Sequence, residues 1–173
     1  TTQPNLDPGQ YAKLGPEQAV IQASKVVGMD PNTMLTFAKI ESSMGASAKN
    51  SKSSAKGLFQ IVDKTWTYLL NKYGAKYNIP PNADKNNPYY NSLLGVAYAK
   101  ENMTHIKGHK EAGIPDNIAL YLAHHFGPTG GNNIIKNARQ NPQASMQGVV
   151  SADSYKSNYR ELTGKSVQQY IEY

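Results

Sequence analysis

The sequence predicts a mostly α-helical domain with at most a small β element near residues 50–62. Three observations support this fold class. Apolar residues recur at the three- and four-residue spacing of amphipathic helices in several segments. Proline and capping residues stand where these segments begin, and glycine stands where several of them end. No segment shows the sustained alternation of apolar and polar residues that is typical of strands.

The first predicted helix follows an arm. Residues 1–15 contain proline and glycine without any periodicity, which is typical of an irregular leader. Helical periodicity begins at Pro16, a residue suited to a first turn, and ends before Gly28. The apolar positions between them are Ala19, Val20, Ala23 and Val27. We therefore expect an N-terminal arm, residues 1–15, and a single domain over residues 16–173.

The next two helices flank a polar segment. Asp30 and Pro31 predict a helix as its N-cap and first-turn proline. This helix should end just before residues 46–57, which are small, polar and basic and predict a loop. Asp63 predicts the cap of the following helix, which Gly74 should end. The expected apolar positions are Met34, Leu35, Phe37, Ala38 and Ile40 in the first helix and Trp66, Leu69, Leu70 and Tyr73 in the second.

The second half of the chain also predicts helices. Asn87-Pro88 opens the helix that we expect to be the longest, with Leu94 and Ala97 along it. A polar break at residues 105–113 follows, and Asp116 then caps a helix that Gly127-Pro128 should stop. Shorter helices are expected around residues 131–140, 143–148 and 153–173.

The composition excludes several function classes. There is no cysteine, which excludes disulfides, thiol catalysis and cysteine-based zinc sites. No apolar run approaches the roughly 18 residues of a membrane span, and the N-terminus lacks the basic start and apolar stretch of a signal peptide. The 18 Lys and Arg residues against 12 Asp and Glu residues give a net charge of +6. This balance favours a polyanionic partner such as nucleic acid, an anionic membrane or an acidic cell-wall polymer.

Glu41 has the strongest claim to chemistry. It follows Ala38, Phe37 and Met34 at helical spacing, so its carboxylate shares a helix face with apolar side chains. Partial desolvation and the negative end of the helix dipole both favour the protonated form that a general acid needs. The alternative is a surface glutamate at a frayed helix end, and periodicity alone leaves both interpretations open.

Three ordered blocks resemble the signature of the soluble lytic transglycosylase family, part of the lysozyme-like superfamily that includes goose-type lysozymes. In the family, a glutamate opens the first block, the second is a glycine-rich element that ends in glutamine, and the third lies on a helix. The corresponding blocks are Glu41-Ser42-Ser43 with Gly45; Ser54-Ala55-Lys56-Gly57-Leu58-Phe59-Gln60; and Asn87-Pro88 with Asn91, Gly95 and Tyr98. The resemblance runs from roughly residue 16 to residue 131.

The resemblance implies a lysozyme-like fold and a catalytic role for Glu41. The substrate-binding residues that it implies are Ser54, Gln60, Tyr73, Tyr121 and His124. The chain departs from the family at two places. Ser54 stands where the family has glycine, and His124-His125-Phe126-Gly127 stands where the family has Tyr-Asn-Ala-Gly. The second departure is similar to phage-encoded members, which implies a phage-type enzyme used for host lysis or carried on a virion.

The reaction depends on how many carboxyl groups take part. Glycosidic cleavage usually needs two, and only Glu41 has a strong claim here, because Asp63 and Asp116 are explained as helix caps. The resemblance implies that one glutamate protonates the oxygen between N-acetylmuramic acid (MurNAc) and N-acetylglucosamine (GlcNAc) in peptidoglycan. It also implies that a 1,6-anhydro ring then closes on MurNAc without water. The alternatives are a goose-type lysozyme-like muramidase that hydrolyses the same β-1,4 bond, and a non-catalytic wall-binding or virion structural domain.

Other constellations are weaker. His105 and His109 have the spacing of a metal pair, but Gly108 lies between them and no carboxylate ligand is apparent, so a solvated basic turn is favoured. Residues 127–131 lack the ending of a phosphate loop, and no serine-hydrolase elbow is present. The lysines of residues 46–57 lack a surrounding nucleic-acid motif. We expect no metal, no cofactor and no nucleic-acid partner, a monomer or a domain of a larger virion protein, and action in the periplasm or cell wall.

Overall fold

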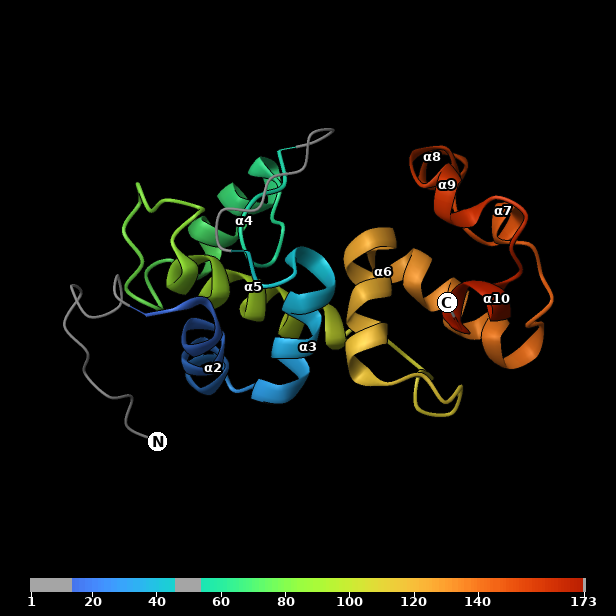
Figure 1. Cartoon of the computed structure of the whole chain (residues 1–173), viewed down its shortest axis with the longest axis horizontal. Helices are drawn as coiled ribbons and strands as arrows, with labels where there is room; N and C mark the ends of the chain where they lie inside the picture. Colours follow the sequence, from blue (N-terminus) through green and yellow to red (C-terminus); the bar gives the residue numbers. More distant parts are fainter. Residues whose placement is uncertain (1–13, 46–53, 173) are drawn as a thin grey trace. The chain divides into compact units, whose positions relative to one another are not determined.

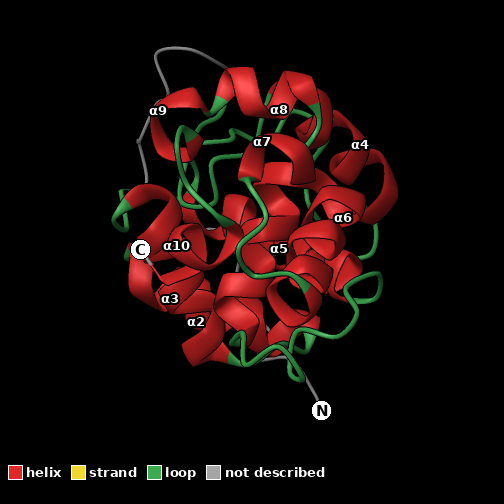
Figure 2. Ribbon diagram, turned by 90° about the vertical axis from the view of Figure 1, so that its right-hand side faces the viewer, coloured by secondary structure: helices red, strands yellow, loops and turns green. Residues whose placement is uncertain are grey.

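The computed structural model describes residues 14–45 and 54–172, and the chain divides into two compact units. The first unit is Thr1–Lys100 and the second is Glu101–Tyr173. The described residues form helices joined by loops, with two isolated antiparallel bridges and no sheet among them (Figures 1 and 2). The predicted mostly α-helical fold class is confirmed. The prediction of a single domain over residues 16–173 involves both units and stays a prediction.

Four helices build the first unit, and α5 continues three residues past its boundary. They are α2 (Pro16–Val27), α3 (Pro31–Ser42), α4 (Asp63–Tyr73) and α5 (Pro88–Met103). Local signals set the ends of α2 and α3 as predicted. Gly28 ends α2 in the left-handed region (φ 93°), with its N–H donating to the Ser24 carbonyl. The Asp30 carboxylate accepts from the Thr33 N–H at 3.0 Å and thereby caps α3.

Two local predictions were wrong. The N-caps of α4 and α6 are Val62 and Pro115, so Asp63 and Asp116 are the first helical residues and not the caps. Ile40 is 42 % exposed, because it lies on the face of α3 opposite the buried one. The prediction that the helix opening at Pro88 is the longest is confirmed among the described residues, because α5 has 16 uninterrupted residues, whereas the non-helical Gly127 divides α6 into two shorter helical segments.

The core of the first unit is apolar. α2 and α3 pack together through their buried faces, and α4 and α5 add theirs. Burial of such side chains supplies about 1.5–3 kcal/mol each relative to exposure. Large buried side chains of this unit include Met34, Phe37, Leu58, Phe59, Ile61, Trp66, Leu69, Tyr89, Leu93 and Leu94.

The second unit is arranged around α6 (Asp116–Gln140). Gly127 has φ 72° and ψ 165° and interrupts the helix, and Pro128 begins the segment that follows. The predicted stop at Gly127-Pro128 is therefore confirmed, and a second helical segment follows up to Gln140. Short helices follow and pack on an apolar cluster that includes Leu122, Ile134 and Ile135. They are α7 (Met146–Val149), α8 (Ala152–Ser157), α9 (Tyr159–Leu162) and α10 (Val167–Glu172).

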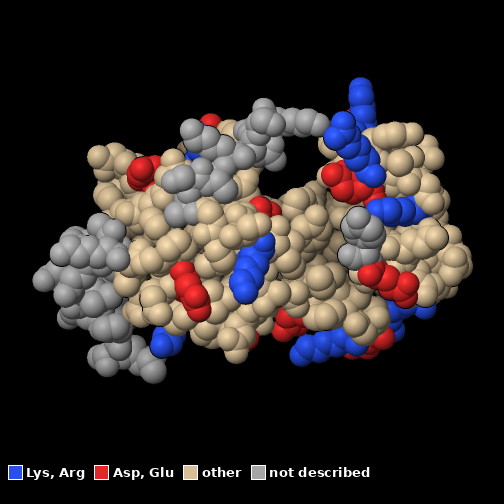
Figure 3. Space-filling view, viewed as in Figure 1, with Lys and Arg blue, Asp and Glu red and all other residues tan. Residues whose placement is uncertain are grey.

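Charged side chains are scattered over the visible face of the described residues. On the face shown in Figure 3, basic and acidic side chains are interspersed within each unit and separated by uncharged residues. Among the described residues, no helix has both the length and the apolar character that crossing a membrane requires.

Candidate active site

Glu41 lies in the last turn of α3, and its side chain is half-buried. The residues three, four and seven positions before it, Ala38, Phe37 and Met34, are all buried. The expected apolar face is therefore confirmed. Ser43 adopts the left-handed conformation (φ 53°) and ends the helix shortly after the glutamate. The carboxyl group consequently stands at the edge of the apolar core, where a half-buried acid remains open to a ligand.

A small hairpin, residues 56–61, follows in the sequence. Lys56 and Ile61 exchange two backbone hydrogen bonds, of 3.2 and 3.1 Å, which confirms the small β element predicted near residues 50–62. Gly57 (φ 80°) and Gln60 (φ 49°) adopt left-handed conformations that reverse the chain. The Gln60 amide donates to the Gly57 carbonyl at 2.9 Å. The hairpin thus depends on one glycine and one strained glutamine, and Gln60 lies at its end.

The buried side chain of Asn91 in α5 holds this hairpin in place through the hairpin backbone. The Asn91 side chain is fully buried and makes three hydrogen bonds. Its oxygen accepts from the Phe59 N–H at 2.9 Å, and its nitrogen donates to the carbonyls of Lys56 (3.2 Å) and Lys85 (2.8 Å). A side chain at Gly57 would collide with the Asn91 amide. Buried amides of this kind are costly to leave unpaired, so the three bonds act together.

The end of α3 is joined to the same hairpin (Figure 1). Ser42, the neighbour of Glu41, donates from its hydroxyl to the Leu58 carbonyl at 2.7 Å. The rings of Phe37 and Phe59 pack at a centroid distance of 5.8 Å. One polar and one aromatic contact therefore hold the hairpin against the turn of α3 that carries Glu41.

Ser54 and Asp63 flank the hairpin and contact each other. The Ser54 hydroxyl accepts from the Asp63 N–H at 2.8 Å. Lys85, whose side chain is 10 % exposed, donates to the Ser54 carbonyl (2.9 Å) and to the Asp63 carboxylate (2.6 Å). The hydrogen bond and the charge of Lys85 hold the pKa of Asp63 below its usual value, and the charge of Lys56 acts in the same direction. Ser54, predicted to contact substrate, thus has a structural role at the base of the hairpin.

Tyr73 is the last residue of α4 and is half-exposed. Its ring stacks on Tyr77 at a centroid distance of 6.3 Å, and the Lys72 ammonium lies 5.4 Å from its ring centroid. The role of Tyr73 in substrate binding stays a prediction.

Tyr121 and His124 lie on α6 in the second unit. Tyr121 packs partly against the apolar cluster and meets the His125 ring at a centroid distance of 4.2 Å. His124 is half-buried and contacts His125 edge to face at 5.5 Å. His125 itself is exposed. The Tyr121 ring thus lies at the edge of the apolar cluster, whereas substrate contact by either residue stays a prediction.

The prediction that His105 and His109 lie in a solvated basic turn is wrong for His109. His109 is 8 % exposed, and its Nε2 lies 2.7 Å from the Asp116 carboxylate, so it is not part of a solvated turn. Asp116 is seven residues away, beyond the turn at Gly113, which is why no carboxylate was apparent near His109 in the sequence. No cluster of three or more potential metal ligands exists among the described residues.

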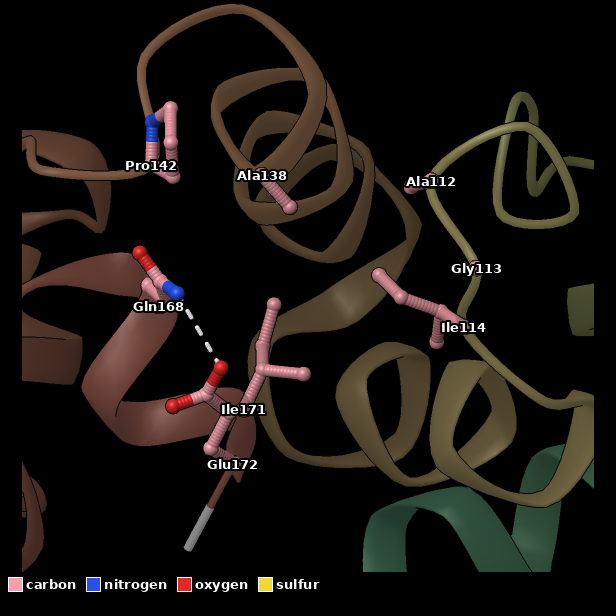
Figure 4. A pocket seen from close by; sticks show the side chains of 8 residues that line it. All are labelled: Ala112, Gly113, Ile114, Ala138, Pro142, Gln168, Ile171 and Glu172. Atoms are coloured by element: carbon pink, nitrogen blue, oxygen red, sulfur yellow. Dashed lines mark hydrogen bonds between the residues drawn. The ribbon is translucent and has the colours of Figure 1, made fainter.

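The second unit also contains a cavity of about 340 Å³. In Figure 4, Gln168 and Glu172 of α10 line one side and Ile114 lies opposite them. The Gln168 amide donates to the Glu172 carboxylate at 3.1 Å. None of the predicted site residues lines this cavity.

Sequence reasoning missed Lys85 and the structural roles of Ser42 and Asn91. An asparagine within the apolar run of α5 is a signal that could have identified Asn91 as a buried hydrogen-bonding residue. Lys85 had no such signal, because its partners lie 31 and 22 residues away in the sequence.

The first unit thus presents a half-buried glutamate at a helix end, beside a hairpin that polar side chains fix in place. This arrangement and the helical fold agree with the lysozyme-like fold that the family resemblance implies. A family model described as transglycosylase SLT domain matches residues 18–147, and the chain belongs to this family. The matched range includes all six predicted site residues. The chain is therefore a peptidoglycan lytic transglycosylase domain, of a family that cleaves glycosidic bonds.

Proposed function

We propose that Glu41 is the single catalytic acid and base of this domain, and that the enzyme cuts the MurNAc–GlcNAc β-1,4 bond to leave 1,6-anhydro-MurNAc. The observation that carries the proposal is the half-buried Glu41 at the end of α3, with its neighbour Ser42 bonded to the hairpin. The first step requires a positioned carboxyl group that can donate a proton to the leaving oxygen.

The proposed reaction needs one carboxyl group. The Glu41 carboxylic acid gives its proton to the glycosidic oxygen, the bond from that oxygen to C1 of MurNAc breaks, and the GlcNAc hydroxyl leaves. The acetamido oxygen of MurNAc closes on C1 and forms a cyclic intermediate. The Glu41 carboxylate then takes the proton of the C6 hydroxyl, and O6 displaces the acetamido oxygen at C1. Glu41 ends protonated, and no water is consumed.

The other acidic residues described in the first unit support a single-carboxylate mechanism. Asp30 caps α3, Asp63 pairs with Lys85, and Asp84 accepts from the Asn86 N–H. Glu17 is exposed in the first turn of α2. Each of the three aspartates thus has a structural partner in the fold.

We further propose that Gln60, Tyr73, Tyr121 and His124 bind the glycan substrate, as the resemblance to the family implies. Ser54 is better explained as a support of the hairpin, because its hydroxyl and carbonyl both bond within the fold. The sequence at residues 124–127 supports a phage-type enzyme that acts on the wall in the periplasm.

Glu41→Gln tests this proposal. The amide cannot donate the proton that the leaving group needs, so turnover of purified peptidoglycan should fall at least about 10²-fold. The matched control is Glu17→Gln, which removes an exposed carboxylate from the same unit and should leave activity unchanged. Clearing of wall suspensions by Glu41→Gln at the wild-type rate would refute the assignment.

A further inference from the structure

We propose that Lys85 is a positioning residue for the reaction, because it closes the base of the hairpin that lies against the Glu41 turn. The inference rests on the proposed function for its catalytic consequence. The closure itself is a property of the first unit and can be measured separately.

Lys85 meets both flanks of the hairpin at once. Its ammonium donates to the carbonyl of Ser54, two residues before the hairpin, and to the carboxylate of Asp63, two residues after it. The Ser54 hydroxyl and the Asp63 N–H complete the contact between these flanks at 2.8 Å. These three bonds hold together the two ends of residues 54–63.

Lys85 also bonds to Asn91, the buried residue that holds the hairpin in place. Its backbone carbonyl accepts from the Asn91 amide at 2.8 Å, and the same amide donates to the Lys56 carbonyl. Asn91 in turn accepts from the Phe59 N–H. Lys85 is therefore connected to the hairpin in two ways. Its ammonium bonds to the two flanks of the hairpin, and its carbonyl bonds to Asn91, which in turn bonds to the hairpin backbone.

Burial makes the ammonium hard to replace. The Lys85 side chain is 10 % exposed, whereas the Asp63 side chain is 74 % exposed. A nearly buried ammonium needs its hydrogen-bond acceptors, and the Ser54 carbonyl and the Asp63 carboxylate supply two of them. An uncharged side chain at this position would leave the Ser54 carbonyl without this donor and would release the two flanks.

This closure affects the position of Glu41 because the hairpin packs against the C-terminal end of α3, which carries Glu41. Ser42 bonds to the Leu58 carbonyl, and Phe37 packs on Phe59. A hairpin that opens at its base changes the position of both contacts, and small displacements of catalytic groups cost orders of magnitude in rate. Lys85 acts through the hairpin and is not placed in contact with substrate.

The experiment compares Lys85→Met with Lys100→Met. Lys100 donates to the Val27 carbonyl at 3.0 Å, so the control also removes one lysine–carbonyl hydrogen bond from the first unit, but away from the hairpin. Two quantities are measured: amide hydrogen exchange at Phe59 and Ile61, and turnover of peptidoglycan per folded molecule.

We expect Lys85→Met to accelerate exchange at both amides and to lower turnover by about ten-fold or more, while Lys100→Met changes neither. Lys85→Arg keeps the charge and should restore part of the turnover. Ser54→Ala removes the hydroxyl of the same closure and should shift both quantities in the same direction by less, which keeps the test valid if Lys85→Met does not fold.

Wild-type exchange and full turnover in Lys85→Met would overturn the inference, as would a lower melting temperature with full turnover per folded molecule. An active Glu41→Gln variant would instead refute the proposed function. In that case the exchange rates of Phe59 and Ile61 still decide whether Lys85 closes the hairpin.

Discussion

The two units use different means to hold their irregular segments. In the first unit, buried polar side chains from distant parts of the sequence fix the hairpin, with Asn91 at its centre. In the second unit, an apolar cluster around α6 holds short helices, and Asn132 fixes the loop before α6 by bonds at exposed positions. The difference teaches that precise placement of an irregular segment needs directional bonds, whereas apolar packing suffices to gather helices.

We expect the largest difference in the free energy of unfolding between alanine variants of Asn91 and Asn132. Asn91→Ala leaves the Phe59 N–H and two carbonyls without their partner in a buried place, and we expect a loss of about 3 kcal/mol or more in the free energy of unfolding. Asn132→Ala also removes two hydrogen bonds, to Lys107 and His105, but at exposed positions where water replaces them, so its cost should be about 0.5–1.5 kcal/mol. Urea unfolding of both variants measures the contrast. Equal losses would contradict the distinction between the units.

Two glycines should give effects of opposite sign. A side chain at Gly95 of α5 would lie within 2.7 Å of the Phe59 Cβ, so Gly95→Ala should displace the buried ring and destabilise the protein by about 1–3 kcal/mol. A side chain at Gly148 of α7 meets nothing within 4 Å, so Gly148→Ala should be neutral or stabilising by up to about 1 kcal/mol. Thermal unfolding measures both, and tolerance of alanine at Gly95 would show that the hairpin contact is loose.

These positions also indicate what the sequence can predict. Asp30 and Gly28 act within three or four residues of their partners, so the predicted ends of α2 and α3 are confirmed. The Glu41 face follows from helical spacing alone. Asn91 and Lys85 bond to residues 22 to 35 positions away, and no local pattern reports such pairs. Glycine followed by proline also predicts the helix stop at Gly127, because both signals act on the local backbone.

Smaller effects are expected on α6. Tyr121→Phe and His124→Ala should each reduce turnover several-fold with little change in melting temperature, because one hydrogen bond to substrate is worth about 0.5–1.5 kcal/mol. Tyr121→Phe keeps the ring that packs on the apolar cluster. Melting temperature and turnover are measured on the same preparations. A lower melting temperature with full turnover would remove the residue from the proposed substrate contacts.

The smallest effect should come from the acid dependence of stability. Lys85 lowers the pKa of Asp63 in the folded protein, so this pair stabilises the fold above the usual aspartate pKa of about 3.9 and loses its contribution as the pH falls through the lower, folded value. Asp63→Asn should therefore flatten the loss of melting temperature below about pH 4. Asp153→Asn, at an exposed aspartate of α8, is the control. An unchanged acid dependence in Asp63→Asn would show that the exposed carboxylate contributes nothing to stability.

Mass analysis of the muropeptides that the wild-type protein releases from purified peptidoglycan tests the central claim most directly. A single catalytic Glu41 that takes the C6 proton predicts disaccharides ending in 1,6-anhydro-MurNAc, each one water lighter than the reducing product of a hydrolase. The Glu41→Gln variant should release neither product. Disaccharides with reducing MurNAc ends alone would contradict the account, because water would then have entered the reaction and a second base would be required.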